Sequence, residues 1–279
     1  MTHRFAKGLF KTLWILRDYL PEIVVGGGWA PFLYYRYLLK DTDRDPIFTR
    51  DIDLLVKPKV PVIGSWTIDQ LLEQEGFKAV FKSRDTPPVI HYEGEFEGEP
   101  VEIEFLTDQV GSDSDLVKKV QPDLHAEALR FISIVVENTI ELMISGKDLP
   151  GMSGQLSVKV PTPAAYIFHK GLVYRRRQDS RKGDKDLYYI FDLLTGCRNL
   201  MPSVMDDFSG LAQRYTPWFK AFIKNLETDF ADPASEGVLR VSAQRPAGAF
   251  MDLDDDQFRY FVNGTFLSIN RDLVEFLPA

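Results

Sequence analysis

Two carboxylates stand at the start of an apolar run in the N-terminal part of the chain. Asp51 and Asp53 flank Ile52, and the run continues from Leu54 to Val56. Because side chains two positions apart on a strand point to the same face, both carboxylates project together while Ile52 enters the core. Neighbouring carboxylates beside a buried strand are unfavourable unless a cation lies between them, and Mg²⁺ takes oxygen ligands. We therefore predict a metal site here rather than a solvated strand end.

A second pair of acids, Glu102 and Glu104, flanks Ile103 in another apolar run. One of them, beside the Asp pair on a neighbouring strand, would complete a site for two metal ions. Such a site activates an attacking oxygen and stabilises a leaving pyrophosphate. Glu104 lies deeper in the apolar run, next to Phe105, and is our choice of ligand. Glu102 lies nearer to Pro100 and is the alternative.

Three glycines, Gly26 to Gly28, separate the short β-branched run Ile23–Val25 from a helix that begins at Trp29. Glycines after a strand let backbone N–H groups approach a polyphosphate, and the helix N-terminus adds a dipole that favours anions. A simple tight turn from strand to helix would have the same sequence. The glycines by themselves therefore leave both interpretations open.

The segment from Lys170 to Lys185 holds seven basic residues and two acidic ones, although the whole chain has 33 Lys and Arg against 41 Asp and Glu. On the helix expected there, Lys170, Tyr174 and Arg177 share one face. That face could hold nucleotide phosphates or the backbone of an RNA. A solvated basic surface is the alternative for Arg175–Arg177.

Together these motifs resemble the polymerase-beta-type nucleotidyltransferase superfamily. Gly27–Ala30 is similar to its Gly-Gly helix start, and Thr49–Leu54 contains its Asp-x-Asp strand. His169-Lys170, Arg175–Arg177 and Lys185-Asp186 follow in the order found in the AbiEii-like abortive-infection toxins, which the chain resembles most within the superfamily.

The resemblance, which covers roughly residues 15–195, implies a metal-dependent nucleotidyltransferase. Such an enzyme transfers a nucleoside monophosphate from an NTP to an acceptor hydroxyl with the help of two Mg²⁺ ions. Asp53 would bridge both ions, and Asp186 would orient Lys170 or an arginine. The implied catalytic residues are Asp51, Asp53, Glu104 and Lys170, of which the three carboxylates are the metal ligands, with Glu102 as the alternative to Glu104. The implied contacts to the nucleotide come from Gly27, Gly28, Arg50, Lys170, Arg177, Lys185 and Asp186.

The motifs leave the acceptor open. The AbiEii-like resemblance implies a tRNA or another RNA end, in a toxin–antitoxin pair with an antitoxin protein as partner. The Gly-Gly-Trp sequence of residues 27–29 also resembles aminoglycoside-modifying nucleotidyltransferases, whose acceptor is a small molecule. A third alternative is a catalytically silent member that binds only a nucleotide or a partner, and the intact set of acids argues against it. A general RNA-binding module conflicts with the net charge of −8.

Hydrophobic patterning predicts an α+β fold with two domains. The resemblance implies that residues 1–150 form a nucleotidyltransferase-type mixed sheet with flanking helices, and we expect residues 151–279 to form a mostly helical domain that carries the basic segment. The expected helices span residues 6–20, 29–39, 68–75, 163–177 and 184–194, with Pro21 ending the first and a left-handed cap at Gly196 after the last. The expected strands span residues 23–25, 52–56, 77–81, 89–92, 101–106, 132–136, 139–144 and 158–160.

Composition excludes several classes of protein. The single Cys197 rules out an intramolecular disulfide, and four scattered histidines argue against a histidine metal cluster. The apolar run Leu13–Leu16 is too short for a signal peptide, and no stretch approaches the roughly 18–20 apolar residues of a membrane span. We expect a cytoplasmic protein without a membrane segment.

Overall fold

The computed structural model describes residues 2–42, 44, 46–47, 49–81, 90–109, 116–145, 154–177 and 179–277. The chain divides into two compact units, Met1–Pro161 and Thr162–Ala279. The first is a mixed sheet with helices and the second is helical in its described residues, so the predicted α+β fold is confirmed. The boundary follows Pro161 rather than residue 150, because the strand that ends at Pro161 pairs with two other strands of the sheet.

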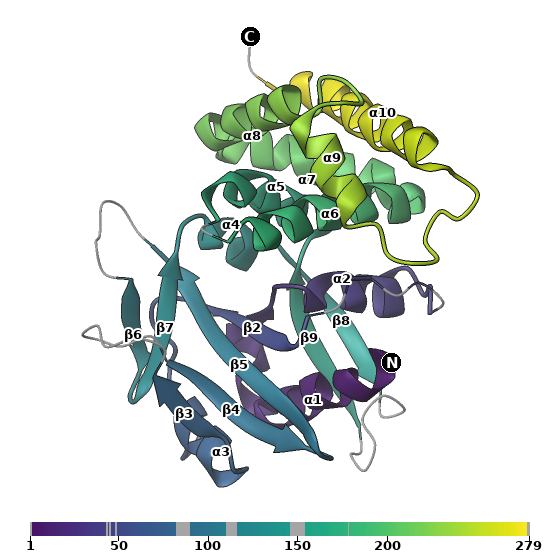
Figure 1. Cartoon of the computed structure of the whole chain (residues 1–279). Helices are drawn as coiled ribbons and strands as arrows, with labels where there is room; N and C mark the ends of the chain where they lie inside the picture. The colour runs from purple at the N-terminus through teal and green to yellow at the C-terminus, as the bar shows by residue number, and fades with distance from the viewer. Residues whose placement is uncertain are drawn as a thin grey trace. The chain divides into compact units, whose positions relative to one another are not determined.

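A nine-stranded mixed sheet forms the core of the first unit (Figure 1). The strand order is β3-β4-β5-β2-β1-β9-β8, and β7 pairs with both β5 and β6. β2 runs parallel to β5 and antiparallel to β1, while β9 runs parallel to β1. The strands are β1 (Ile23–Val25), β2 (Asp51–Val56), β3 (Lys78–Phe81), β4 (Ile90–Phe96), β5 (Glu99–Asp108), β6 (Val117–Gln121), β7 (Leu124–Leu129), β8 (Thr139–Ser145) and β9 (Gln155–Pro161).

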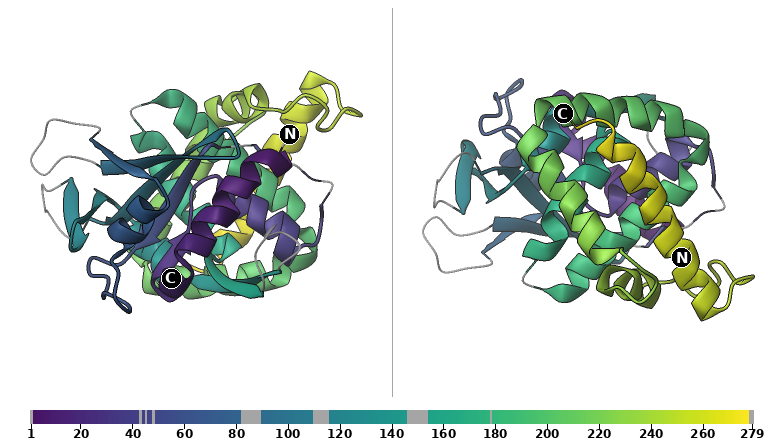
Figure 2. Two further views of the ribbon diagram at one scale, coloured as in Figure 1. Left: turned by 90° about the horizontal axis from the view of Figure 1, so that it is seen from below. Right: turned by 90° about the horizontal axis from the view of Figure 1, so that it is seen from above.

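Helices pack on both faces of this sheet. α1 lies along β4 and β5 (Figure 2), where a Cβ on Gly8 would be 2.7 Å from a methyl group of Val101. On the opposite face, α4 packs Ile132 and Val135 against Leu55 of β2. The helices of this unit are α1 (Thr2–Ile15), a 3₁₀ turn (Arg17–Glu22), α2 (Trp29–Leu33), which continues as a π-helix (Tyr34–Leu38), α3 (Ile68–Gln74) and α4 (Ile132–Glu137).

Two predictions for the first unit are wrong, and two of its strands were missed. The β-branched run Ile132–Val136 forms α4 and not a strand, because residues three positions apart on a helix both reach the apolar cluster on the sheet. The opening helix ends at Ile15, and Pro21 lies inside the following 3₁₀ turn instead of ending the helix. The strands β6 and β7 were not predicted at all.

The second unit starts with a helix whose N-terminal signal was predicted correctly. Thr162 Oγ1 accepts a hydrogen bond from the Ala165 N–H at 3.2 Å, and Pro163 occupies the first turn. The predicted left-handed cap at Gly196 is wrong, since Gly196 is helical and Cys197 has a φ of −86°. The helices are α5 (Pro163–Val173), α6 (Ser180–Gly196), α7 (Met201–Arg214), α8 (Thr216–Asp229), α9 (Glu236–Ala243) and α10 (Asp255–Val274), with 3₁₀ turns at Tyr174–Arg176 and Arg198–Leu200.

None of the helices in the described residues combines the length and the apolar character needed to cross a membrane.

Candidate active site

Four carboxylates lie on one face of the sheet, on the neighbouring parallel strands β2 and β5. Asp51 is paired in register with Glu102, and Asp53 with Glu104. All four residues are half-buried, whereas Ile52 between the two aspartates is fully buried. The predicted strand and its alternation are thus confirmed. Both candidates for the third acid stand beside the Asp pair.

The glycine turn meets β2 at Asp53. The Gly26 N–H donates a hydrogen bond to the Asp53 carbonyl oxygen at 2.9 Å. Gly27 has a φ of 56°, and a Cβ at this position would lie 1.7 Å from Asp53 Oδ2. Only glycine permits both this backbone and this approach. Gly28 has an ordinary φ of −73° before α2, and Arg50 is exposed immediately before β2.

Strand β4 adds two residues that sequence reasoning missed. His91 is paired with Glu104, and Glu93 with Glu102, in the antiparallel β4–β5 register. His91 is buried, and its Nε2 lies 2.8 Å from Glu93 Oε1 and 3.7 Å from Glu102 Oε1. Side chains alternate between the two faces of the sheet along residues 90–96. Together with the hairpin turn, this alternation could have predicted that His91 and Glu93 lie on the acidic face, the face that carries Asp51, Asp53, Glu102 and Glu104.

The chemistry of these donors suits a hard cation, because carboxylate oxygens are the ligands that Mg²⁺ takes. In the part of the chain that the structure describes, no three carboxylate, imidazole or thiolate groups are arranged as ligands of one metal ion. The register brings the carboxylates to one face. Which of them bind a metal ion stays a prediction.

In the second unit, Lys170 and Arg177 converge on Asp186. Lys170 Nζ lies 2.5 Å from Asp186 Oδ1, and Arg177 Nε lies 2.9 Å from Asp186 Oδ2. Lys170 is buried, and its ammonium lies 5.4 and 5.7 Å from the ring centres of Tyr166 and Tyr189. Burial alone would raise the pKa of the Asp186 carboxyl, but the two cations outweigh it and lower that pKa. Asp186 is therefore held as a carboxylate that positions both basic side chains.

The helix face predicted for Lys170, Tyr174 and Arg177 is not formed. α5 ends one residue before Tyr174, and the 3₁₀ turn Tyr174–Arg176 changes the direction of the side chains that follow. Lys170 and Arg177 meet through Asp186 instead of through a shared helix face. Lys185, the residue before Asp186 on α6, is exposed.

Comparison with known proteins identifies the family of the chain. A family model described as Nucleotidyltransferase matches residues 17–209. The chain belongs to this nucleotidyltransferase family. The matched segment includes the glycine turn, the carboxylates of β2 and β5, and the Lys170–Asp186 pair. The predicted assignment to the nucleotidyltransferases is thereby confirmed and a nucleotide substrate is implied, while the AbiEii-like assignment stays a prediction.

Among solved structures, the nucleotidyltransferase is similar to an antigenic nucleotidyltransferase-like protein from Paracoccidioides brasiliensis. The two sequences are 20% identical over 69% of this chain and 75% of the other, with a TM-score of 0.38. A search of the curated proteins found no match.

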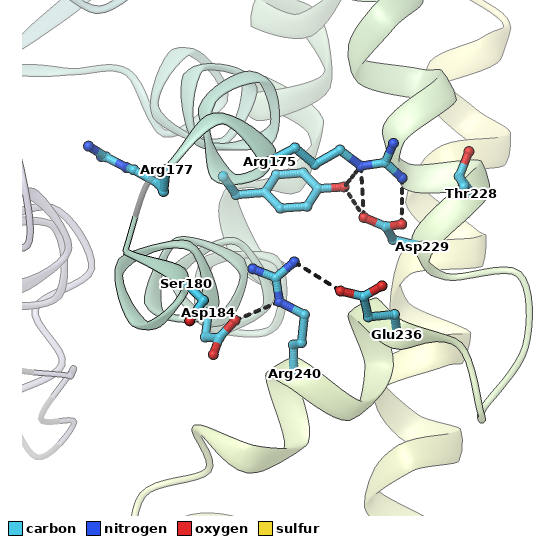
Figure 3. A pocket seen from close by; sticks show the side chains of 9 residues that line it. Arg175, Arg177, Ser180, Asp184, Thr228, Asp229, Glu236 and Arg240 are labelled. Carbon is cyan, nitrogen blue, oxygen red and sulfur yellow. Dashed lines mark hydrogen bonds and ion pairs between the residues drawn. The ribbon is translucent and has the colours of Figure 1, made fainter.

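The second unit of the nucleotidyltransferase also contains a pocket of about 780 Å³ (Figure 3). Arg175 contacts the carboxylate of Asp229 through Nε at 3.0 Å and Nη2 at 2.5 Å, and Arg240 Nε lies 2.5 Å from Asp184 Oδ1. The Tyr174 hydroxyl donates to Asp229, and burial together with this carboxylate raises the pKa of Tyr174. One ion pair thus joins the 3₁₀ turn after α5 to the end of α8, and the other joins α6 to α9. The lining residues are Tyr174, Arg175, Arg177, Ser180, Asp184, Thr228, Asp229, Glu236 and Arg240.

Proposed function

We propose that this protein is a Mg²⁺-dependent nucleotidyltransferase that moves a nucleoside monophosphate from an NTP to an acceptor hydroxyl and releases pyrophosphate. One observation carries the proposal. Asp51 and Asp53 lie in register with Glu102 and Glu104 on neighbouring strands, and the glycine turn packs against the carboxylate of Asp53. In a member of a nucleotidyltransferase family, such a row of carboxylates beside a glycine turn suits metal-bound triphosphate.

The proposed roles of the residues are those that the family resemblance implies. Asp51, Asp53 and Glu104 would hold the metal ions, with Glu102 as the alternative to Glu104. Two bound Mg²⁺ ions would activate the acceptor oxygen and neutralise charge on the leaving pyrophosphate. The turn at Gly27 and Gly28 would donate backbone N–H groups to the phosphates. The other proposed contacts to the nucleotide are Arg50, Lys170, Arg177, Lys185 and Asp186.

We propose an RNA end as the acceptor, in the toxin–antitoxin context that the AbiEii-like resemblance implies. The support is a set of exposed basic residues around the start of α6: Arg176, Arg181, Lys182 and Lys185. A polyanionic backbone would be attracted to these side chains, whereas a polycationic aminoglycoside would be repelled.

Incubation with each α-labelled NTP, Mg²⁺ and either total RNA or an aminoglycoside tests the proposal. We expect label to enter RNA and not the aminoglycoside. Chelation of Mg²⁺ should stop the transfer. Label in the aminoglycoside would move the assignment to a small-molecule enzyme. Nucleotide binding without transfer to any acceptor would identify a silent member.

The Asp53→Asn variant tests the carboxylates directly. It keeps the shape of the side chain but removes one negative charge from the proposed metal site. We expect transfer to fall by at least ~10³-fold while the folded state is retained. Glu141→Gln is the matched control, because Glu141 is exposed on β8 and contacts Ser157 at 2.8 Å. An Asp53→Asn protein with the transfer rate of the control would show that the Asp pair is structural.

A further inference from the structure

The outer face of α10 carries large apolar side chains at a constant spacing of seven residues. Tyr260, Leu267 and Val274 are 68%, 47% and 42% exposed. Because seven residues make almost two helical turns, these side chains lie in one line along the helix. The right-hand view of Figure 2 shows α10, in yellow, in front of the other helices of the second unit. The inner face of α10 already packs into this unit through Phe258, Val262, Phe266, Ile269 and Leu273.

Two further exposed residues, Gly264 and Arg271, complete this line. Positions 260, 264, 267, 271 and 274 alternate in steps of four and three, which is the spacing of a seam between two helices. Among the described residues, a Cβ on Gly264 would meet open space. The packing of a single chain therefore does not require glycine here, although glycine is unfavourable in the interior of a helix. The seam thus contains one hole, at Gly264.

The seam is complementary to a second, antiparallel copy of itself. When Gly264 of each copy faces Leu267 of the other, the leucine side chain fills the hole. In the same register Tyr260 faces Arg271 of the other copy, so the guanidinium can lie on the aromatic ring. A parallel pair would instead bring the two Arg271 side chains together and leave two Gly264 holes facing each other. The antiparallel arrangement is a two-fold symmetric contact in which both copies use the same surface.

We propose that the exposed face of α10 is a dimerisation surface whose occupant is α10 of a second copy of this chain. The contact would run from Gln257 to Val274, about 25 Å along the helix. Two helices in contact over this length bury less than the roughly 1,200–2,000 Å² of a standard interface. We therefore expect a reversible dimer with a Kd between about 1 and 100 µM. The inference does not depend on the proposed metal site, because the carboxylates of that site lie on β2 and β5.

Sedimentation velocity of the whole protein, at concentrations from well below to well above this range, tests the proposal. We expect the wild type to change from monomer to dimer. Leu267→Ser and Tyr260→Ser should each raise the Kd at least ~10-fold. Met143→Ser is the control, because Met143 is a large apolar side chain that is 53% exposed on β8. A protein that stays monomeric throughout, or a Leu267→Ser variant that dimerises like the control, overturns the proposal.

Gly264→Gln separates a role in dimerisation from a role in the single chain. Glutamine favours a helix more than glycine does and has open space at this position, so the melting temperature of the monomer should rise. The same side chain would occupy the hole that receives Leu267, so the Kd should rise at least ~10-fold. An unchanged Kd in Gly264→Gln would contradict the proposed contact, whatever happens to the melting temperature.

Disulfide cross-linking tests the direction of the two helices. In the antiparallel register, Gln257 of one copy faces Val274 of the other, whereas two Val274 side chains lie about 25 Å apart. A mixture of Gln257→Cys and Val274→Cys proteins should therefore form a cross-linked heterodimer under mild oxidation, and neither variant alone should cross-link. Cys197 is buried and should not react. Efficient cross-linking of either variant alone would show parallel helices and overturn the proposed arrangement.

Discussion

Because Gly27 has no side chain, the carboxylate of Asp53 can lie directly beside its backbone. Its φ of 56° is unfavourable for other residues, and a Cβ would lie 1.7 Å from Asp53 Oδ2. We expect Gly27→Ala to lower the free energy of unfolding by about 1–2 kcal/mol and to reduce transfer at least ~10²-fold, because the Asp53 carboxylate must move. Gly28→Ala is the control for the backbone, since Gly28 has a φ of −73°. Urea denaturation and the transfer assay measure both effects; equal stability of the two variants would contradict the argument.

His169 links the stability of the protein to pH. Burial, with a further contribution from the neighbouring Lys170, lowers the pKa of His169 to about 3. The unfolded chain therefore binds one more proton than the folded state between about pH 6.5 and pH 3. Stability contributed by the neutral ring is complete above the unfolded pKa and is lost as the pH falls through this window, by at most about 1.4 kcal/mol per pH unit.

We expect His169→Gln to flatten the dependence of the free energy of unfolding on pH between pH 4 and pH 6. Denaturant titrations at several pH values measure this slope. His125→Gln, at a half-buried position on β7, is the matched control and should keep the wild-type slope. An unchanged slope in His169→Gln would show that other groups control the acid sensitivity.

At the scale of residues, the sequence alone was enough to predict which face of the strand carries Asp51 and Asp53 and where the glycine turn lies. It was not enough to predict that His91 lies beside these acids. Strict alternation in a buried strand placed Asp51 and Asp53 on one face without any tertiary information. The contact between His91 and Glu102 depends on the register of β4 and β5, which is set by the turn at Glu97-Gly98. One residue of slip in that turn would move His91 to the opposite face. Composition and spacing alone do not fix such a register.

At the scale of elements, the wrong prediction of a strand at residues 132–136 has a physical cause. The β-branched run Ile132–Val136 has strand propensity, yet it forms α4 because Ile132 and Val135 complete the apolar cluster with Val24, Leu55 and Leu106. Propensity differences of a few tenths of a kcal/mol per residue are smaller than the energy of burying two such side chains. Elements that pack on an existing surface are therefore predicted least well from local sequence.

The ion pairs around the pocket of the second unit make an element-scale prediction. Asp229 accepts hydrogen bonds from both Arg175 and the Tyr174 hydroxyl, and its side chain is only 11% exposed. Removing it leaves the buried hydroxyl with only the Asn225 carbonyl oxygen, at 3.4 Å, as an acceptor, and it leaves the guanidinium without its counterion. We expect Asp229→Ala to lower the free energy of unfolding by about 2 kcal/mol, as measured by urea denaturation. Arg181→Ala is the control, because its pair with Asp179 is exposed and should be dispensable.

At the scale of the whole molecule, the negative charge of the protein opposes the binding of an anionic nucleotide unless cations are present. The chain carries a net charge of −8, and Glu93, Glu102, Glu104, Asp51 and Asp53 lie on one face of the sheet. A nucleoside triphosphate is itself a polyanion. Without cations, the approach of the triphosphate to this face is opposed by every carboxylate on it. The basic cluster around Lys170 is partly neutralised by Asp186.

Divalent metal should therefore control both nucleotide affinity and stability. We expect calorimetry with ATP, GTP, CTP and UTP to show binding in Mg²⁺ and at least ~10²-fold weaker binding in chelator, or about 2.7 kcal/mol. Mg²⁺ without nucleotide should raise the melting temperature, because it binds the folded carboxylate site and not the unfolded chain. In Asp53→Asn this rise should shrink, while the melting temperature in chelator should increase since one repelling charge is gone. Glu141→Gln should follow the wild type throughout. Equal nucleotide affinity in Mg²⁺ and chelator would show that the phosphates are held by basic side chains and backbone N–H groups alone, and the acidic face would then need another explanation.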